Sequence, residues 1–512
     1  MTMFATKFKF ALAFLAGALM TFGYAPFSYW LVLFVSLPIY LYLLAQTQPK
    51  QSFKIGFAFG LGWFGAGISW VHVSIADFGG LPLIASIGLM LLLCSYLALF
   101  PALASYLIKR YFSLKLWPLA LPFVWLSIEW LRSWLFTGFP WLSLGYSQIN
   151  SPLAGWLPLI GEFGLNALIL IICSSLALSF IRKHWLSNLS LTGIIFISGV
   201  VLDQVNWATP TGNTAQIAMV QGNIRQELRW TPEQDQPTMD KYLEMTSNHW
   251  LNNDVIIWPE AAIPQLEPIA LDYLRDLDSI AAASNTGLIT GIVNYNFETK
   301  QAYNNLIGLG VKNSASSNQI DGVTVGHYRY LHANRFAKHH LLPIGEFIPL
   351  ESWIRGLAPI FDLPMSSFTR GDYQQANIQA NGFNFAPAIC FEIAFPRQIA
   401  SNLYFNTDFI ITVSNDAWFG ASHGPAQHLE IAQVRAKEFG LPVLRSTNNG
   451  ITAFIDHTGA IQSQLPQFED AVLTDKIQLV SGETPYRKLG DWPIWLISLS
   501  LFFIAVKFRM SR

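Results

Sequence analysis

Charged residues are nearly missing from the N-terminal part of the chain, and this feature limits the possible folds more than any other. Residues 1–202 contain ten lysines and arginines and three acidic residues, Asp77, Glu129 and Glu162. The complete chain of 512 residues is 52% hydrophobic and 12% charged, whereas soluble globular chains carry about 25% charged residues. This composition argues strongly against an ordinary soluble enzyme.

Long apolar stretches in the chain match the thickness of a lipid bilayer. A hydrocarbon core of roughly 30 Å needs about 20 mostly apolar residues in a helix. Internal prolines such as Pro101, Pro118 and Pro122 are tolerated when neighbouring groups satisfy the freed backbone. Eight membrane spans are predicted, near residues 10–24, 29–45, 55–71, 81–107, 116–130, 164–181, 186–202 and 492–506.

Lysine and arginine indicate the orientation of these spans, because they favour the cytoplasmic side of short connections. With eight spans and a cytoplasmic N-terminus, the inner segments hold 12 basic residues and the outer connections hold only Arg132. Both chain ends are then cytoplasmic. Because seven spans precede it, the globular part is expected outside the cytoplasmic membrane, on the periplasmic side. A cytoplasmic globular part would reverse this charge bias.

Two features of the apolar part allow a second interpretation. The first span, preceded by Lys7 and Lys9, could be a cleaved signal peptide, although its removal would upset the even number of spans. Glu129 and Arg132 lie at i and i+3 near the end of the fifth span, where polar groups are expensive. We favour a structural ion pair over a contact with a lipid head group.

Residues 203–488 have a nearly normal composition, with 18 basic and 28 acidic residues, and are long enough for their own core. Short apolar runs between turn signals indicate a layered α/β or α+β domain. We therefore expect seven transmembrane helices in 1–205, a globular domain in 206–488, and an eighth helix with a cytoplasmic tail in 489–512. Predicted strands are 215–220, 254–258, 287–293, 385–389, 409–413 and 453–455, and predicted helices are 238–252, 269–284 and 427–438.

Polar residues suited to chemistry follow several of the predicted strands, where layered folds usually build their sites. Glu260 follows the run DVIIWP, Cys390 follows FAPAI, and Asn415 follows FIITVS. Lys338 and Glu346 lie in the long connection from Tyr328 to Pro349.

Cys390 is the only cysteine of the globular domain, since Cys94 and Cys173 fall inside predicted spans. A domain in an oxidising compartment usually pairs its thiols in disulfides, and Cys390 has no partner in its domain. It is either a nucleophile or a small buried core residue, and its position alone does not separate the two.

Three other classes of site have little support. The net charge of −1 provides no basic surface for nucleic acid. The histidines between His327 and His340 lack a compact ligand spacing, so we expect no metal and no other cofactor. The letters GASHG around Ser422 fit a serine elbow, but SNDAWF separates them from the preceding strand, whereas an elbow turns directly from strand to helix.

Five motifs, in this order, resemble the nitrilase superfamily: WPEAAIP at 258–264, KHHLLPIGEFIP at 338–349, ICFE at 389–392, SNDAWFG at 414–420 and STNNGITAFID at 446–456. Joined to eight spans, the whole chain is similar to the apolipoprotein N-acyltransferase family, whose members complete bacterial lipoprotein maturation. The resemblance implies an αββα sandwich on the periplasmic face of a polytopic α-helical membrane bundle, in the bacterial inner membrane.

Residue by residue, the resemblance makes Cys390 the nucleophile, Glu260 the general base and Lys338 the stabiliser of the charged intermediate. It also gives functional positions at Trp230, Glu346 and Glu392. For the two glutamates we expect orientation of Lys338 or Cys390, with structural pairing as the alternative, and Trp230 could simply pack the domain onto the membrane. Phe391 replaces the tyrosine that often follows the nucleophile in this family, so a phenolic role is in doubt.

The chemistry favours transfer of an acyl chain to an amine, because a thioester on Cys390 reacts readily with amines and the thiolate attacks. If Glu260 is desolvated, its raised pKa would suit it to accept the thiol proton. The expected donor is a phospholipid, phosphatidylethanolamine or phosphatidylglycerol, and the acceptor is a diacylglyceryl-apolipoprotein. The alternatives are a membrane-tethered amidohydrolase and a transporter with a sensing domain.

Overall fold

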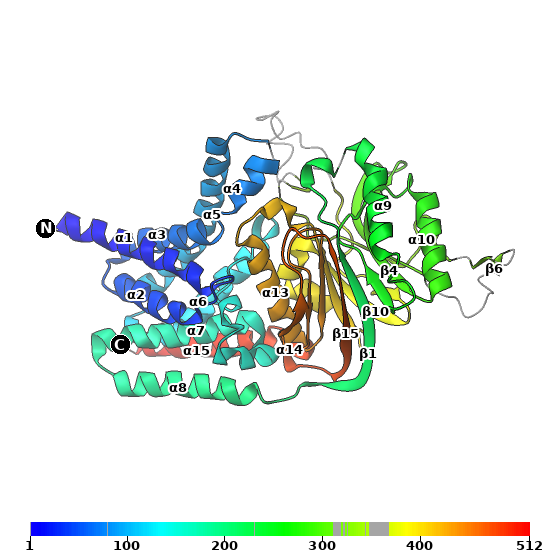
Figure 1. Cartoon of the computed structure of the whole chain (residues 1–512). Helices are drawn as coiled ribbons and strands as arrows, with labels where there is room; N and C mark the ends of the chain where they lie inside the picture. The colour runs from blue at the N-terminus through cyan, green and yellow to red at the C-terminus, as the bar shows by residue number, and fades with distance from the viewer. Residues whose placement is uncertain are drawn as a thin grey trace. The chain divides into compact units, whose positions relative to one another are not determined.

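The computed structural model describes residues 2–78, 80–229, 231–310, 319–320, 323–324, 326–343, 345–347 and 368–511. The chain divides into two compact units. The helical unit comprises Met1–Trp207, Ala421–Glu430 and Glu483–Arg512, and the α/β unit comprises Ala208–Gly420 and Ile431–Gly482. Figure 1 shows helices throughout the first unit and two stacked sheets in the second.

A helix occupies each of the eight stretches for which a span is predicted. Their bounds are α1 (Thr2–Leu19), α2 (Leu33–Ala45), α3 (Pro49–Gly67), α5 (Leu83–Tyr111), α6 (Trp117–Arg132), α7 (Leu157–Arg182), α8 (Trp185–Leu202) and α15 (Trp492–Met510). Pro101 and Pro122 lie inside α5 and α6, as membrane helices tolerate. Shorter helices in this unit are α4 (Val71–Val73) and α14 (Pro485–Leu489).

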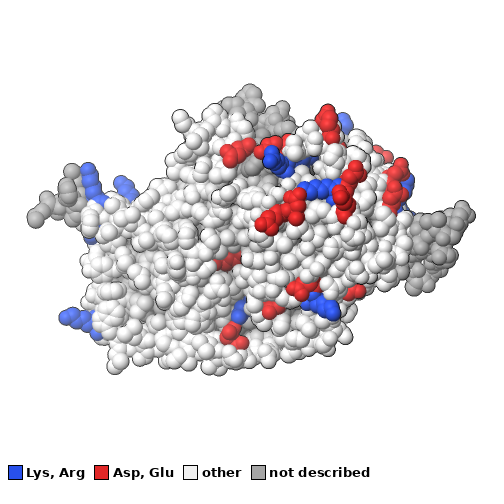
Figure 2. Space-filling view, viewed as in Figure 1, with Lys and Arg blue, Asp and Glu red and all other residues white. Residues whose placement is uncertain are grey.

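Fewer than eight of these helices satisfy the length and apolarity of a full span. In the described residues five helices do, or six if the bent pair Pro49–Gly67 and Val71–Asp77 forms one span. The helix Trp30–Ala45 is apolar but shorter. Side chains such as Leu186 and Phe503 expose apolar surface on α8 and α15, and Figure 2 shows that on this face charged side chains gather over the α/β unit.

Small residues and one ion pair hold the helical unit together. Gly17 of α1 faces the carbonyl of Phe59, and Gly62 of α3 faces that of Phe14, so closely that a Cβ at either glycine would strike the opposing backbone. This is the close packing that small residues permit between membrane helices. Arg132 donates from Nε to Glu129 at 3.1 Å, and both side chains are buried. The expected structural ion pair is confirmed.

Two β-sheets form the α/β unit. In the described residues, the strand order of the first sheet is β15 (Ala471–Gly482), β1 (Ala208–Gln221), β2 (Val255–Ile257), β4 (Gly287–Asn296), β5 (Gln301–Leu309) and β8 (Arg335–Ala337). The strand β3 (Ile263–Leu266) also pairs with β4. The second runs β14 (Ile461–Gln464), β13 (Ala453–Ile455), β12 (Val443–Thr447), β11 (Phe409–Ser414), β10 (Phe383–Ile389), β9 (Ile378–Ala380). A separate pair is β6 (Gln319–Ile320) with β7 (Val323–Thr324).

One hydrophobic core lies between the two sheets and another lies outside the first. Ile257 and Ile289 of the first sheet share a core with Phe409 and Ile411 of the second. The opposite face of the first sheet packs against α9 (Asp235–Thr246) and α10 (Leu271–Ser284) through a second cluster that includes Leu274. The helices α12 (Pro396–Ser401) and α13 (Gly424–Phe439) follow β10 and β11. The predicted two-sheet sandwich is confirmed.

Parallel pairing places the ends of the functional strands together. The strands β1, β2 and β4 are parallel neighbours in the first sheet, and β10, β11 and β12 in the second. Ile389 pairs with Val413, so the residues that follow β10 and β11 leave the sheet at the same edge. All six predicted strands exist in the structure, whereas β3, β5, β6, β7, β8, β9, β12, β14 and β15 were not predicted.

Candidate active site

Glu260 sits on a sharp turn just beyond β2. The next residue, Ala261, has a positive φ of 44°, a conformation that costs free energy for a residue with a Cβ. The buried guanidinium of Arg229 donates to the carbonyl oxygens of both Glu260 and Ala261 and so fixes this turn. Gly291 of β4 lies against the same backbone and leaves no room for a side chain.

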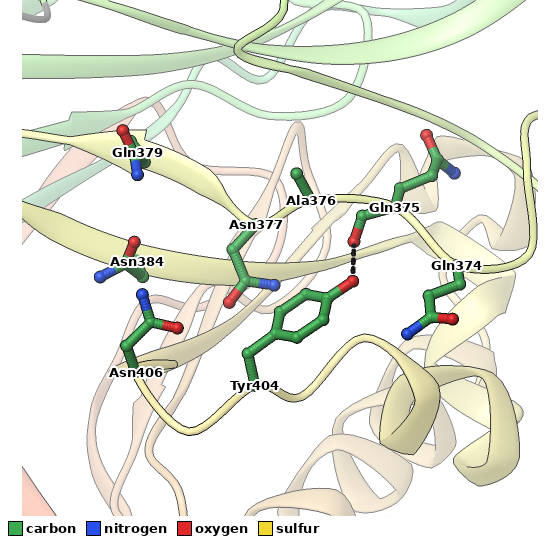
Figure 3. A pocket seen from close by; sticks show the side chains of 8 residues that line it. All are labelled: Gln374, Gln375, Ala376, Asn377, Gln379, Asn384, Tyr404 and Asn406. Atoms are coloured by element: carbon green, nitrogen blue, oxygen red, sulfur yellow. Dashed lines mark hydrogen bonds between the residues drawn. The ribbon is translucent and has the colours of Figure 1, made fainter.

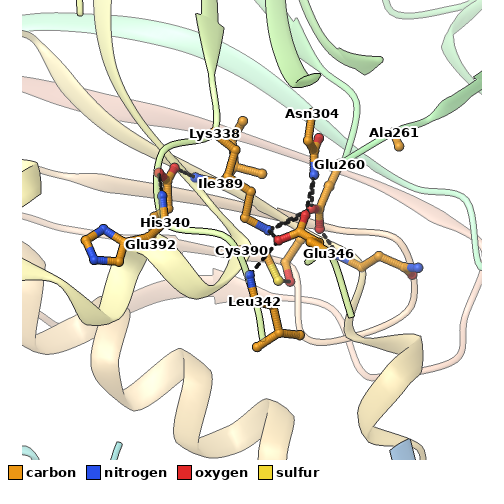
Figure 4. A network of polar contacts seen from close by, with 12 residues as sticks. Glu260, Ala261, Asn304, Lys338, His340, Leu342, Glu346, Ile389, Cys390 and Glu392 are labelled. Atoms are coloured by element: carbon orange, nitrogen blue, oxygen red, sulfur yellow. Dashed lines mark hydrogen bonds and ion pairs between the residues drawn. The ribbon is translucent and has the colours of Figure 1, made fainter. Parts of the chain in front are cut away.

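Lys338 leaves the end of β8 and lies between two carboxylates. Its Nζ is 2.9 Å from a carboxylate oxygen of Glu346 and 3.4 Å from Oε1 of Glu260, and its side chain is 2% exposed. Figure 4 shows the three side chains converging with Cys390. Burial lowers the pKa of Lys338, but the charges of Glu346 and Glu260 more than offset it, and the net pKa is raised. Lys338 therefore carries a fixed positive charge.

Asn304 of β5 bridges the same two carboxylates. Its Nδ2 donates to Oε1 of Glu260 at 2.8 Å and to Oε1 of Glu346 at 3.0 Å. The second oxygen of Glu346 accepts from the backbone N–H of Leu342, and that of Glu260 accepts from the N–H of Asn415 at 3.0 Å. Each carboxylate is thus held at both oxygens.

Cys390 follows β10 directly and has a positive φ of 54°. A non-glycine residue in this region marks a strained turn, and such strain is concentrated at functional sites. Cys390 as a residue is half-buried, and Oγ of Ser414 at the end of β11 lies 3.3 Å from its sulfur. Burial and the nearby charge of Glu260 raise the pKa of Cys390, so the resting residue is a thiol.

The expected rise in the pKa of Glu260 is wrong for this structure. Burial does raise it, but the charges of Lys338 and Arg229 and the donors Asn304 and Asn415 outweigh burial, and the pKa of Glu260 lies below its ordinary value. The residue is therefore an ionised carboxylate beside a neutral thiol. It can accept a proton without first having to lose one.

Glu392 connects the turn after β10 with the turn after β8. Its oxygens accept from the backbone N–H groups of Ile389, His339 and His340 at 2.8 to 3.0 Å, and from Nε2 of Gln398 at 2.7 Å. Burial raises the pKa of Glu392, and these donors oppose that effect. Ile389 precedes Cys390 and His339 follows Lys338, so Glu392 fixes the spacing of the two residues.

The remaining predicted positions differ in what the structure shows of them. Phe391 is buried and its ring meets that of Phe395 edge to face at 5.0 Å. Trp230 lies outside the described residues. In the part of the chain that the structure describes, no group of three or more His, Cys, Asp or Glu could hold a metal ion.

A polar hollow elsewhere on the α/β unit contains none of the predicted site residues. It has a volume of about 320 Å³ and is drawn in Figure 3. Tyr404 donates its hydroxyl to the carbonyl of Gln375 at 2.8 Å, and the Gln375 side chain in turn bonds the backbone of Ala337. These two residues support the strand β8 that precedes Lys338.

Comparison with known proteins identifies the family of the chain. Residues 16–175 match the apolipoprotein N-acyltransferase N-terminal domain, and residues 216–485 match the carbon-nitrogen hydrolase family. The chain is 45% identical to the apolipoprotein N-acyltransferase of Photobacterium profundum, over 98% of this chain and 96% of the relative. The chain belongs to the apolipoprotein N-acyltransferase family.

Other members of the apolipoprotein N-acyltransferase family align over nearly the same length. The Vibrio parahaemolyticus protein is 46% identical over 95% of this chain and 94% of its own, and the Haemophilus influenzae protein is 36% identical over 98% and 95%. The membership covers the helical part and the α/β part together.

Sequence reasoning missed three residues that shape the site. Asn304 and Asn305 directly precede the apolar run LIGL of β5, and a pair of amides inside a mostly buried strand is the signal that could have found Asn304. Ser414 ends the apolar run FIITV beside the predicted nucleophile strand. Arg229 has no local signal, because its function depends on a turn 31 residues later in the chain.

Proposed function

We propose that this protein transfers an acyl chain from a phospholipid to the α-amine of an S-diacylglyceryl-cysteine at the N-terminus of an apolipoprotein. The observation that carries the proposal is the convergence of an ionised Glu260, a charged Lys338 and a neutral Cys390 in a chain of this family. These are a proton acceptor, an oxyanion stabiliser and a nucleophile for acyl transfer.

The first half-reaction forms a thioester. Glu260 takes the Cys390 proton as the sulfur attacks the ester carbonyl, and the oxyanion that forms is stabilised by Lys338, with the N–H of Phe391 as a further donor. The tetrahedral intermediate then collapses, the ester C–O bond breaks, and Glu260 returns the proton to the departing glycerol oxygen. A lysophospholipid leaves and the acyl group remains on Cys390.

The second half-reaction regenerates the thiol. The amine of the diacylglyceryl-cysteine attacks the thioester carbonyl, the C–S bond breaks, and Glu260 relays the amine proton to the sulfur. Two hydrophobic substrates then alternate in one site, which is a ping-pong scheme. The donor in this scheme is phosphatidylethanolamine or phosphatidylglycerol.

The chain's placement in the membrane is part of this proposal. All eight apolar helices cross the bacterial inner membrane, both chain ends are cytoplasmic, and the α/β unit lies on the periplasmic side. The distribution of basic residues along the sequence supports this orientation. Both substrates are anchored in a membrane, which is why the enzyme is as well.

The function is tested by separating transfer from hydrolysis. The purified protein is given phosphatidylethanolamine with a labelled acyl chain and a synthetic diacylglyceryl-cysteine peptide, and the products are identified by mass spectrometry. We expect N-acylated peptide and lysophospholipid in equal amounts, and neither with Cys390→Ala. Release of free fatty acid at the same rate without the peptide would establish a hydrolase instead.

A further inference from the structure

A buried chain of three polar residues ends at the sulfur of Cys390. Ser414, Asp416 and Arg445 are each at most 1% exposed. Oγ of Ser414 lies 2.5 Å from Oδ1 of Asp416 and 3.3 Å from Sγ of Cys390. Arg445 forms an ion pair with the second oxygen of Asp416. The mechanism above uses none of these three residues.

The single hydroxyl proton of Ser414 can point to only one of its two neighbours. Asp416 is the stronger acceptor, because its carboxylate is paired with the guanidinium of Arg445 and hydrogen bonds from hydroxyl to carboxylate are short, about 2.5–2.7 Å. A sulfur is a weak acceptor and lies farther away. The proton of Ser414 is therefore held by Asp416, and Oγ presents a lone pair to Cys390.

We propose that Ser414 accepts the S–H hydrogen bond of the resting Cys390 and so acts as a positioning residue for the nucleophile, with Asp416 and Arg445 fixing the direction of the hydroxyl. This rests on the proposed function of Cys390. In the first step the S–H bond breaks and an O–H bond forms on Glu260, while Ser414 keeps its own proton.

This hydrogen-bond arrangement disfavours ionisation of Cys390 before the substrate binds. A charged sulfur would face the lone pair of Ser414, together with the negative charges of Glu260 and Asp416, against the positive charges of Lys338 and Arg229. The positions of the heavy atoms also allow Oγ of Ser414 to donate to the sulfur; a hydroxyl held in that direction would instead stabilise the thiolate and lower the pKa of Cys390. The two directions of this hydrogen bond therefore shift the pKa of Cys390 in opposite directions.

The test compares the reactivity of the thiol in the full-length protein with and without the hydroxyl. The protein in detergent is freed of acyl groups with neutral hydroxylamine, and alkylation of Cys390 by iodoacetamide is followed by peptide mass spectrometry. Since the thiolate is the reacting form, loss of the acceptor in Ser414→Ala lowers the pKa of Cys390 by roughly 0.5 to 1, the value of an ordinary hydrogen bond. The variant then reacts about 3-fold to 10-fold faster at a fixed pH.

Thr412→Val is the matched control. Thr412 lies two residues earlier on β11, is buried, and its hydroxyl has no hydrogen-bond partner among the described residues. Its alkylation rate should equal that of the wild type. Slower or unchanged alkylation of Ser414→Ala would overturn the proposal and leave the three residues as a network that only holds the fold.

The infrared S–H stretch of Cys390 provides a second measurement, which does not use Ser414→Ala. It is isolated as the difference between the wild type and Cys390→Ala. We expect a lower frequency in the folded protein than in the unfolded chain, because the thiol donates to Ser414. An equal frequency would overturn the proposal. Failure of the acyl-transfer assay with both thiol results intact would reject the proposed function alone.

Discussion

Glu260 and Lys338 form a buried ion pair, with Nζ 3.4 Å from Oε1. The pair explains how a buried carboxylate can stay ionised. Burial alone would favour the neutral acid, and the charge of Lys338 is the largest of the opposing effects. The same lysine is positioned to stabilise the oxyanion, so it supports the base and the intermediate in turn.

The pH dependence of thioester formation should reflect this pair. Glu260 must be ionised to accept the proton, so the rate should fall only as the pH drops through its lowered pKa, below the ordinary value of 4.5. In Lys338→Met, burial is less opposed and the pKa of Glu260 rises, so the acid limb should move to higher pH. Single-turnover rates measured across pH check this.

The maximal rate of Lys338→Met should also fall about 100-fold to 1,000-fold, as when one oxyanion donor is removed. Lys476→Met, which changes an exposed lysine of β15, should change neither the rate nor the pH profile. An acid limb that stays in place in Lys338→Met would mean that the lysine does not control the charge of Glu260.

Asn304→Ala should slow thioester formation about 10-fold or more while leaving the protein folded. The substitution removes the donor shared by Glu260 and Glu346, and charge-assisted hydrogen bonds of this kind stabilise by about 1.5–3 kcal/mol each. The control is Asn305→Ala, because the next residue is equally buried and its Oδ1 has no partner among the described residues. Equal rates for the two variants would contradict a role for the Asn304 bridge.

Glu392→Gln should reduce stability as well as activity. The glutamine replaces one accepting oxygen by a donor, which then faces N–H groups, at a cost of about 2 kcal/mol. We expect a lower thermal midpoint and a slower first half-reaction, because the turns that carry Cys390 and Lys338 lose their common anchor. Glu298→Gln, at an exposed position, is the control. Lost activity at an unchanged midpoint would instead indicate direct participation in the chemistry.

Glu260 and Cys390 could be singled out from the sequence because they follow apolar strands, whereas their roles and the positions of Lys338, Glu346 and Glu392 came from the family resemblance. Glu260 and Cys390 come after runs whose burial on both faces is evident from their composition, and layered folds build their sites at such strand ends; that the two strands belong to different, stacked sheets was not evident from the sequence. The edge strands β14 and β15 were missed because they are largely exposed. Polar residues interrupt the apolar ones along both strands, so neither has a continuous apolar run. The charge state of Glu260 could not be predicted, since Lys338 and Arg229 reach it from 78 and 31 residues away.

The number of membrane spans in the helical unit could also not be predicted fully from the sequence. Helices form where apolar length predicts them, but α2 is only 13 residues long, and α3 is followed by a 62° bend. Hydropathy measures composition along the chain and contains no information on bends or on which helices shield one another.

Packing of the helical unit can be tested with two glycines of α3. Gly62→Ala places a Cβ against the backbone of Phe14 in α1, whereas a Cβ at Gly65 meets nothing within 4 Å. Overpacking of this kind costs about 1–3 kcal/mol, so Gly62→Ala should lower the thermal midpoint and Gly65→Ala should not. A similar midpoint for both would show that α1 and α3 do not pack as described.

The acyl-enzyme itself tests the central claim most directly. The purified protein is incubated with phosphatidylethanolamine and no acceptor, and its intact mass is measured beside those of Cys390→Ala and Glu260→Ala. We expect the wild type to gain the mass of one fatty acyl group on Cys390, both variants to remain unmodified, and a diacylglyceryl-cysteine peptide to discharge the adduct. No added mass, or an adduct lost equally fast in water alone, would contradict transfer through a thioester on Cys390.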